Sequence, residues 1–286
     1  MFNGKKISII GPGMMAEAMI SGMIRQGLTG GEALTVSGPS LERVQHLQQK
    51  YGIQPMTDNL RAARQADIVV LSVKPQRLER VLGGLRGGIQ PHALVLSIVA
   101  GASLEKICTG LAHDIVVRSM PNTPAQIGEG ITVWTASPAV SSQQKEVARQ
   151  ILGALGEEIF VEEENYLDMA TALSGSGPSY VFLFMEAMVD AGVHLGFPRR
   201  IAEQLVVKTL IGSAHYYQQR METTHLARLR NDVTSPGGTS AAALYYLEKA
   251  GFRTAISRAV WAAYERSQEL GKGGKSHAPD QPAPQE

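Results

Sequence analysis

The sequence contains almost no cysteine. Cys108 is the single thiol among 286 residues, so disulfides between its own cysteines cannot stabilise the fold. Such a chain is typical of a reducing compartment, and we expect a cytoplasmic protein. In the segment SLEKICTGL, Cys108 shares helical spacing with Leu104, Ile107 and Leu111. This spacing favours core packing over catalysis as its role.

An excess of either charge is also absent. Lys and Arg number 27, and Asp and Glu number 26, a balance that argues against a dedicated nucleic-acid or membrane-surface binder. The longest apolar stretch, around residues 93–102, is far too short to span a bilayer, and we expect no secretory signal. Because 44% of residues are hydrophobic and 19% are charged, we expect a soluble protein with a substantial core, in one large or two ordinary domains.

Several catalytic signatures are missing as well. The seven histidines show no metal-ligand spacing, so we expect no bound metal. Neither a G-x-S-x-G nucleophile elbow nor a P-loop is present.

A dinucleotide-binding motif is what the N-terminal region does contain. Gly11, Gly13 and Ala16 fit the G-x-G-x-x-G/A pattern between an expected strand at residues 6–10 and an expected helix. The first Gly allows the tight turn, the second lets the pyrophosphate approach the backbone, and the small third residue lets helix and strand pack closely. The pattern predicts cofactor contacts from Gly11, Pro12, Gly13, Met14 and Met15, although methionine side chains here are more typical of core packing.

Strand-like and helical segments then alternate. Short β-branched runs at residues 33–38, 66–75, 92–101 and 114–124 are separated by helical stretches such as 40–51 and 77–85. This alternation predicts an α/β domain with a Rossmann-type doubly wound parallel sheet. Ligands of such sheets bind beyond the carboxyl ends of the strands. Candidate cofactor contacts near those ends are Asn59, Val73, Lys74, Pro75, Ala100 and Asn122, although Lys74 is equally typical of a solvated lysine after a strand.

The expected second strand lacks the acidic residue that NAD-specific sites place at its end. The segment reads Val-Ser-Gly-Pro-Ser at residues 36–40. Ser37 and Ser40 offer hydrogen bonds to a 2′-phosphate, and Arg43 follows one helical turn later. We therefore expect NADPH to be the preferred cofactor, with NADH accepted less well.

The second half of the chain is helical in pattern. Helical stretches are expected at residues 180–195, 199–220, 241–250 and 252–270. We expect a nucleotide-binding domain over residues 1–163, a helical domain over residues 164–270 and a disordered tail over residues 271–286, which is rich in Gly, Lys, Pro and Gln.

The segment NDVTSPGGTSAAALYYLE, residues 231–248, joins a Pro-Gly-Gly break to an alanine-rich helical stretch. Thr239 and Ser240 are natural N-cap residues, and glycines let a ligand approach the N–H groups of a helix start. The segment therefore indicates an anion site with hydroxyls beside it, although a capped inter-helix turn has the same pattern. A second close-approach site is indicated by Gly175-Ser176-Gly177 before Pro178, for which a helix kink or a helix–helix contact is the alternative.

Together these segments resemble the pyrroline-5-carboxylate reductase family over nearly the whole chain, about residues 5–270. The resemblance is carried by GPGMMAEAM, SVKP, RSMPNTP, LSGSGPSY, GFPRR and, most specifically, LRNDVTSPGGTSAAALYYLE. Two positions depart from the family pattern. Ser240 stands where the family usually has Thr, which keeps a hydroxyl, and Met14 stands where a polar residue is common.

The resemblance implies an enzyme that reduces L-1-pyrroline-5-carboxylate to L-proline with NAD(P)H, the last step of proline synthesis. The substrate carboxylate would bind at Gly237, Gly238 and Thr239, with Ser176 nearby. A hydroxyl of Ser240 or Thr239 would donate a hydrogen bond to the imine nitrogen as hydride arrives. The cofactor carries the difficult chemistry and the protein mainly orients.

Three other functions remain to be weighed. A β-hydroxyacid dehydrogenase would carry Lys and Asn where Val181 and Phe184 stand, so its base is missing. A reductase of other cyclic imines is a further alternative. A non-catalytic nucleotide-binding regulator is disfavoured because both loops are intact.

The resemblance also implies a homodimer, or a larger homo-oligomer built from dimers. Apolar stretches such as VVKTLIGSA and AISRAVWAAYE carry more apolar surface than one small bundle hides. We expect active sites completed across the dimer interface.

Overall fold

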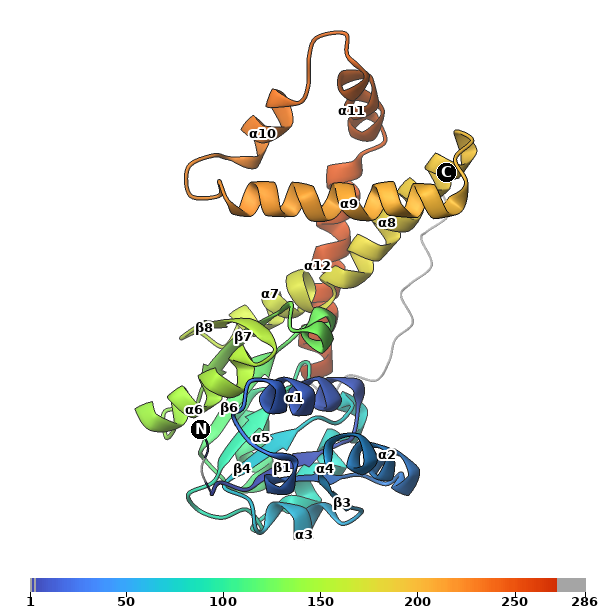
Figure 1. The fold of residues 1–286 in the computed structure, drawn as a ribbon. Helices are drawn as coiled ribbons and strands as arrows, with labels where there is room; N and C mark the ends of the chain where they lie inside the picture. Colours follow the sequence, from blue (N-terminus) through green and yellow to red (C-terminus); the bar gives the residue numbers. More distant parts are fainter. Residues whose placement is uncertain (1, 3, 272–286) are drawn as a thin grey trace, which may run out of the picture. The chain divides into compact units, whose positions relative to one another are not determined.

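In the computed structural model, which describes residues 2 and 4–271, the chain divides into two compact units. The first comprises residues up to 176 together with residues 262–271, and the second comprises residues 177–261 (Figure 1). These units reflect packing alone, and the domain boundary that we expect at residues 163 and 164 remains a prediction. The expected disorder of the tail lies outside the described residues except at Gly271, which ends a helix.

The first unit is built on one eight-stranded sheet in the order β3-β2-β1-β4-β5-β6-β7-β8. All neighbouring strands are parallel except β6 and β7, which pair antiparallel. The strands are β1 (Ile7–Ile10), β2 (Leu34–Ser37), β3 (Gln54–Met56), β4 (Ile68–Leu71), β5 (Leu94–Ser97), β6 (Val116–Met120), β7 (Gly130–Ala136) and β8 (Gly156–Phe160).

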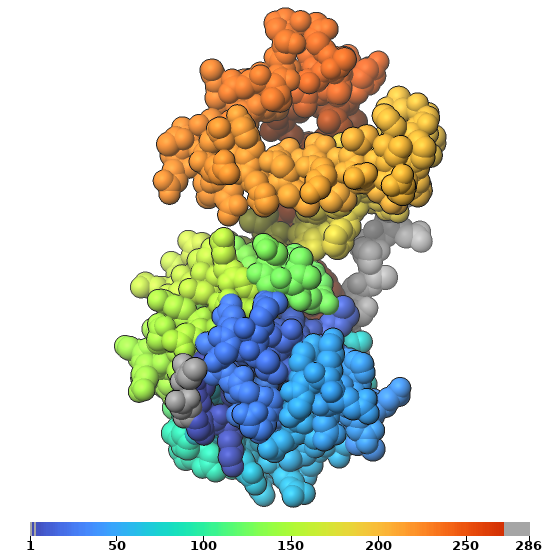
Figure 2. Space-filling model, in the orientation of Figure 1, coloured from blue at the N-terminus to red at the C-terminus, as the bar shows by residue number. Residues whose placement is uncertain are grey.

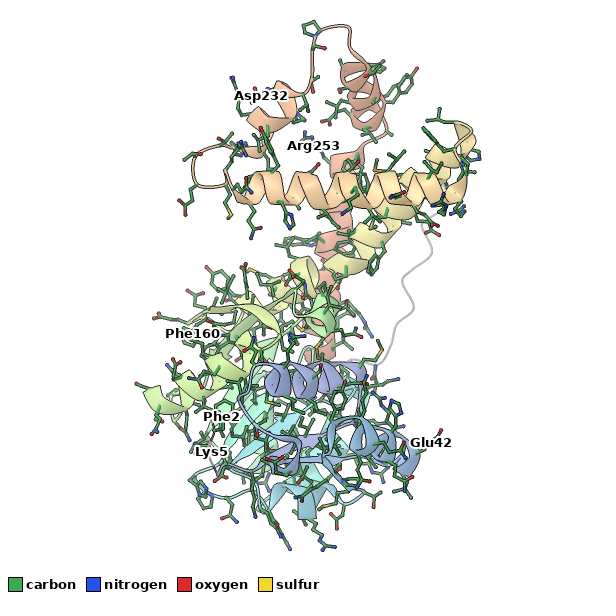
Figure 3. All side chains as sticks on the ribbon, in the orientation of Figure 1. Phe2, Lys5, Glu42, Phe160, Asp232 and Arg253 are labelled. Carbon is green, nitrogen blue, oxygen red and sulfur yellow. The ribbon has the colours of Figure 1, made fainter. Side chains whose placement is uncertain are left out.

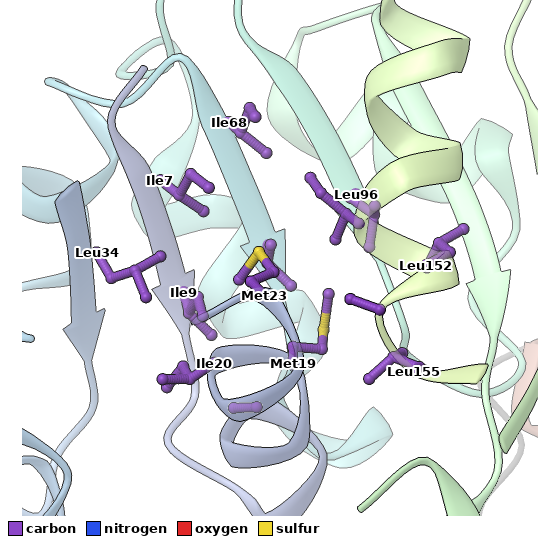
Figure 4. Packing of buried hydrophobic residues seen from close by; sticks show 14 of the residues in the cluster. Ile7, Ile9, Met19, Ile20, Met23, Leu34, Ile68, Leu96, Leu152 and Leu155 are labelled. Atoms are coloured by element: carbon purple, nitrogen blue, oxygen red, sulfur yellow. The ribbon is translucent and has the colours of Figure 1, made fainter. Parts of the chain in front are cut away.

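Helices cover both faces of this sheet, because its central strands are apolar on both sides. One face packs against α1 (Met14–Arg25), α2 (Leu41–Tyr51) and α6 (Ser142–Gly153). The other face packs against α3 (Asn59–Ala63), α4 (Leu78–Leu85) and α5 (Leu104–Leu111). Successive strand residues therefore alternate between two cores: Ile68 and Val70 join the first, and Val69 and Leu71 the second. Figure 4 shows Met19, Ile20 and Met23 of α1 against Ile7 and Ile9 of β1.

The predicted Rossmann-type α/β sheet is confirmed, with an antiparallel extension that the sequence pattern did not indicate. The order β3-β2-β1-β4-β5-β6 is that of a doubly wound dinucleotide-binding fold, whose ligand binds where the order reverses, between β1 and β4. Short 3₁₀ turns lie at η1 (Gly31–Ala33), η2 (Pro75–Arg77) and η3 (Thr123–Ile127).

A buried ion-pair network fixes the end of α12 (Phe252–Gly271) within the first unit. Arg118, on β6, is only 4% exposed. Its guanidinium donates to Glu164 and to Asp168, each at 2.8 Å, and Asp168 also accepts the Ser267 hydroxyl at 2.8 Å. Asp168 lies on α7 (Tyr166–Ala170). Removing one member would leave a buried charge unpaired, which makes such networks strong structural ties.

The second unit contains α8 (Gly177–His194), α9 (Arg199–Gln218), α10 (Leu226–Asp232), α11 (Thr239–Lys249) and the first half of α12. The predicted helical character of this half is confirmed. Helix α10 was not among the helices that the sequence pattern predicted. The buried cluster described in this unit is small, comprising Val189, Ala202 and Val206 between α8 and α9. No residue of α10 or α11 is buried; Figure 3 labels Asp232 at the end of α10. Among the described residues, no helix is long and apolar enough to cross a membrane.

Candidate active site

The glycine-rich turn after β1 has a geometry that only glycine adopts easily. Gly11 has φ of +105°, and its N–H donates to the Ser37 carbonyl at 2.8 Å. A Cβ at this position would overlap the Ser72 carbonyl and the Val73 side chain. Gly11 therefore lets β1 pass directly beside the end of β4 before the chain turns into α1.

Neither the backbone conformation nor the packing around the described residues requires a glycine at position 13. Gly13 is the N-cap of α1 with φ of −77°, and a Cβ there would meet no heavy atom of the described residues within 4 Å. The open space lies at a helix N-terminus, where unpaired N–H groups favour an anion. This geometry fits the pyrophosphate of a dinucleotide, which needs close approach to the backbone at the second glycine.

The residues next to Gly11 and Gly13 have different surroundings: some lie in the exposed turn, and one packs against the core. Pro12 packs against Gly38, where a Cβ would overlap the proline ring. Met14 is 64% exposed at the start of α1, whereas Met15 packs against the core. The side chain of Met15 therefore acts as core filler, and a cofactor contact from this residue would come from its backbone.

A cleft of about 780 Å³ lies at the carboxyl ends of β1, β2 and β4. It brings together four predicted cofactor residues, Gly11, Ser37, Asn59 and Val73. The rest of its lining is Gly38, Pro39, Thr57, Asp58, Leu60, Gln76, Arg77, Arg80, Val81 and Gly84. The other predicted contacts are outside this lining: Pro12, Gly13, Met14, Met15, Ser40, Arg43, Lys74, Pro75, Ala100 and Asn122.

The end of β2 carries the polar groups that we expect to select the cofactor. The buried Ser37 hydroxyl donates to Asn59 Oδ1 at 2.7 Å, which leaves the Asn59 Nδ2 donors for a ligand. Ser40 is the N-cap of α2, where its Oγ accepts from the Arg43 N–H at 3.3 Å. Its hydroxyl hydrogen is therefore still available for donation.

Arg43 is engaged within the protein. Its Nε donates to the Pro12 carbonyl at 3.0 Å, and its Nη2 pairs with Glu17 at 2.5 Å. Partial burial opposes ionisation of Glu17, but hydrogen bonds from Lys50, Arg43 and Tyr51 outweigh it and lower the pKa of Glu17 to about 2. Glu17 is thus ionised at neutral pH and holds the Arg43 guanidinium against the turn.

The remaining predicted contacts follow other strands. Lys74 is exposed at the N-cap of η2, directly before Pro75; its carbonyl accepts the Arg77 N–H at 2.9 Å, and its ammonium group has no partner among the described residues. Ala100 is half-buried after β5. Asn122 follows β6, and its Oδ1 accepts the Ile131 N–H at 3.0 Å, so its amide nitrogen remains available.

The Pro-Gly-Gly break of the second unit is an exposed helix start. Gly237 has φ of +74°, a conformation that favours glycine. Gly238 is the N-cap of α11, so the expectation that Thr239 and Ser240 cap this helix is wrong. Both lie inside its first turn instead, because the extended conformation needed for a cap falls on Gly238. Their hydroxyls thus do not cap the helix.

This helix start offers several donors with no protein acceptor. Among the described residues, the backbone N–H groups of Thr239, Ser240 and Ala241 have no partner, nor do the Thr239 and Ser240 hydroxyls, and Ser240 is half-buried. The geometry can therefore hold a carboxylate and present a hydroxyl beside it.

A π-helical turn, η4 (Thr171–Gly175), precedes α8. The Ser176 N–H donates to the Thr171 carbonyl at 2.8 Å, and the Ser174 hydroxyl donates to the Ala170 carbonyl at 2.9 Å. A Cβ at Gly175 would crowd Met120 at the end of β6. Turns of this type occur frequently at functional sites, and this one carries the candidate Ser176.

Cys108 lies half-buried on α5. Burial, with the nearby Asp114 carboxylate, raises the pKa of its thiol, which disfavours the reactive thiolate. Among the described residues, no group of three or more His, Cys, Asp or Glu residues is placed to hold a metal ion.

Sequence reasoning missed five polar lining residues of the cleft: Thr57, Asp58, Gln76, Arg77 and Arg80. For the two arginines a signal existed. Residues 77, 80, 81 and 84 recur at helical spacing on the face that does not carry the apolar residues 78, 82 and 85.

A cleft at the switch point of a doubly wound sheet, in a chain that also has unpartnered donors at a helix start, is typical of a pyridine-nucleotide-dependent oxidoreductase. Comparison with known proteins gives the particular family. A family profile described as "Pyrroline-5-carboxylate reductase dimerisation" matches residues 164–270. One described as "NADP oxidoreductase coenzyme F420-dependent" matches residues 6–101.

Individual proteins agree with these profiles over almost the full length. The pyrroline-5-carboxylate reductase of Synechocystis sp. is 44% identical, covering 93% of this chain and 98% of its own. The crystal structure of Plasmodium falciparum pyrroline carboxylate reductase with NADP bound is 32% identical, with a TM-score of 0.86 and coverage of 94% and 98%. A solved structure of the Coxiella burnetii pyrroline-5-carboxylate reductase is 35% identical, with a TM-score of 0.83 and coverage of 95% and 99%. The chain belongs to the pyrroline-5-carboxylate reductase family, and its cofactor is a pyridine nucleotide. The β-hydroxyacid dehydrogenase and regulatory alternatives are not favoured.

Proposed function

We propose that this chain reduces L-1-pyrroline-5-carboxylate to L-proline, with NADPH preferred over NADH. The observation that carries the proposal is the start of α11, where the Thr239, Ser240 and Ala241 N–H groups and two hydroxyls lack partners in the part of the chain that the structure describes. The substrate is a small ring with one carboxylate and one imine, so it needs these two kinds of donor and little else.

The substrate carboxylate binds at the Gly237–Thr239 backbone, where the N-terminal partial charge of α11 stabilises it. One hydroxyl, from Ser240 or Thr239, donates a hydrogen bond to the imine nitrogen, whose electron density rises during the reaction. Ser176, after the π-helical turn, is a further substrate contact. When bound, the pyridine nucleotide supplies the hydride.

Residues of the first unit hold the cofactor. The open backbone at Gly11–Met15 receives the pyrophosphate. Ser37, Ser40, Arg43 and Asn59 surround the adenosine ribose, and the absence of an acidic residue at the end of β2 admits a 2′-phosphate there. The residues that follow the other strands, Val73–Pro75, Ala100 and Asn122, contact the remaining length of the dinucleotide.

Oligomer formation is part of the proposal. Large apolar side chains of the second unit are exposed, including Phe182 at 63%, Leu183 at 67% and Trp261 at 62%. Figure 2 shows that the segment carrying α10 and α11 leaves an opening towards α9. A dimer through these helices, with larger assemblies built from dimers, would bury this surface and complete each active site with residues of both protomers. The cytoplasmic location expected from the cysteine content remains a prediction.

The test is product analysis with purified protein. L-1-pyrroline-5-carboxylate and NADPH should yield L-proline and NADP in equal amounts, with a higher kcat/KM for NADPH than for NADH. L-Proline should compete with the imine substrate and not with NADPH. Turnover of a β-hydroxyacid in place of the imine, or no turnover at all, would overturn the proposal.

A further inference from the structure

Two arginines line the nucleotide cleft, and their side chains have no partner among the described residues. Arg77 ends η2, and Arg80 lies one turn further along on α4. Neither guanidinium forms an ion pair or hydrogen bond with another described residue. Both line a cleft that is also lined by Ser37, Gly38 and Asn59. Their charges are therefore available to a ligand that binds in this cleft.

The three faces of α4 explain why these arginines point into the cleft. Leu78, Leu82 and Leu85 are buried in the core. Glu79, Gly83 and Arg86 line a separate groove against α5. Residues 80, 81 and 84 form the remaining face and line the cleft together with Arg77, the N-cap of the helix. Because the leucines fix the rotation of the helix, the direction of Arg77 and Arg80 follows from core packing.

Arg43, in contrast, is already neutralised. It donates to the Pro12 carbonyl and pairs with Glu17, and the low pKa of Glu17 keeps this pair ionised at neutral pH. A ligand that binds the Arg43 guanidinium would have to break its ion pair with Glu17. Among the described residues, Arg77 and Arg80 form no ion pair that a ligand would have to break. The cleft also contains one carboxylate, Asp58, whose Oδ1 caps α3 by accepting from the Arg61 N–H at 3.0 Å. Because the lining contains two arginines and one carboxylate, its net charge is positive.

We infer that Arg77 and Arg80 bind the adenosine 2′-phosphate of NADPH and set the preference for NADPH over NADH. The inference rests on the proposed function, since it concerns the cofactor of the same reaction. NADH carries a hydroxyl at that position, so the two guanidiniums gain a charged acceptor only from the phosphorylated cofactor. Ser37, Ser40 and Asn59 supply neutral hydrogen bonds, and the arginines supply the charge.

The experiment measures equilibrium binding, which needs no turnover. Kd values for NADPH, NADH, adenosine 2′-monophosphate and adenosine are determined by calorimetry for wild type, Arg77→Ala, Arg80→Ala and the double variant. Arg64→Ala is the matched control, because Arg64 is an exposed arginine of the same unit that does not line the cleft. Melting temperatures show that each variant is folded.

Each single alanine variant should raise the Kd for NADPH and for adenosine 2′-monophosphate about tenfold, and the double variant about 100-fold. The Kd values for NADH and adenosine should change less than about threefold, and Arg64→Ala should match wild type.

An equal loss of NADPH and NADH affinity would mean that the arginines stack on adenine, and the inference would fail while the proposed function stood. Unchanged NADPH affinity in the double variant would overturn it as well. A wild-type protein that binds neither dinucleotide would overturn the proposed function together with the inference.

Discussion

At the scale of the residue, Gly13 separates the needs of the fold from those of the ligand. Its φ of −77° is accessible to any residue, and the space beyond its α-carbon is open. Gly13→Val should therefore fold with little change in melting temperature. Its side chain would stand where we propose that the pyrophosphate binds, and should raise the Kd for NADPH by at least about 100-fold.

The control for this change is Gly83→Val. Gly83 lies on α4, also with open space at its α-carbon, and outside the nucleotide cleft. The Kd of Gly83→Val for NADPH should equal that of wild type. Undiminished affinity in Gly13→Val would show that the glycine-rich turn has been assigned the wrong role.

Glu17 predicts a dependence of stability on pH. Its pKa falls from an ordinary 4.5 to about 2. A carboxyl with a lowered folded-state pKa contributes stability above its unfolded pKa, and this contribution is lost as the pH falls from about 4.5 towards 2. Because the side chain is partly exposed, solvent screening leaves roughly 1 kcal/mol.

Urea unfolding of wild type and Glu17→Gln between pH 7 and pH 2.5 measures this effect. Wild type should be the more stable at pH 7, and the difference should shrink as the pH approaches 2.5. A difference that is constant over this range would show that the ion-pair cluster with Arg43 and Lys50 contributes nothing.

At the scale of the element, the loop before α11 is set by two glycines with different requirements. Gly237 needs its positive φ. A Cβ on Gly238 would come 2.5 Å from the Ser235 Oγ. Gly238→Ala should therefore displace the loop and raise the KM for the imine substrate by about tenfold, while the Kd for NADPH stays within about twofold.

A second variant separates crowding from any direct role of Gly238. Adding Ser235→Ala to Gly238→Ala removes the closest contact and should bring the raised substrate KM part of the way back to the wild-type value. Should Gly238→Ala raise the NADPH Kd as much as the substrate KM, the loop would not be a dedicated substrate site.

The sequence predicted a strand correctly where a continuous run of apolar residues marks the whole strand. β1, β2, β4, β5 and β6 are buried on both faces and read as apolar runs. β3 has three residues and contains Pro55, and β8 (GEEIF) is half-exposed, so neither carried such a run. β7 was missed, although its residues alternate between more and less buried positions. Helix α10 has only seven residues, none of them buried.

The same distinction applies to the candidate site, where some features could be predicted from the sequence and others could not. The glycine pattern and the Pro-Gly-Gly break could be predicted, since each is contained in a few consecutive residues. The roles of Arg77 and Arg80 depend on what α4 faces across the cleft, and the pairing of Arg43 with Glu17 joins two helices. Such contacts between distant segments are fixed by the packing of the sheet, which the sequence pattern gives only in outline.

At the scale of the whole molecule, the exposed apolar surface of the second unit predicts an obligate dimer. Light scattering should give at least twice the chain mass of 30.7 kDa at working concentration. Specific activity should fall on dilution below the dimer dissociation constant, because each active site would lack its partner residues. Phe182→Asp, at a 63% exposed position of α8, should yield an inactive monomer. A monomer that retains full activity would contradict this account.

The most direct test of the central claim, that the start of α11 binds and polarises a cyclic imine, is steady-state kinetics of Ser240→Ala and Thr239→Ala with L-1-pyrroline-5-carboxylate at saturating NADPH. A hydrogen bond to a developing charge is worth about 1.5–3 kcal/mol, so removing the hydroxyl that serves the imine nitrogen should lower kcat roughly 10- to 100-fold with a smaller change in substrate KM. We predict this pattern in one of the two variants, which identifies the donor. Wild-type kcat and KM in both would show that the segment is only a turn before a helix.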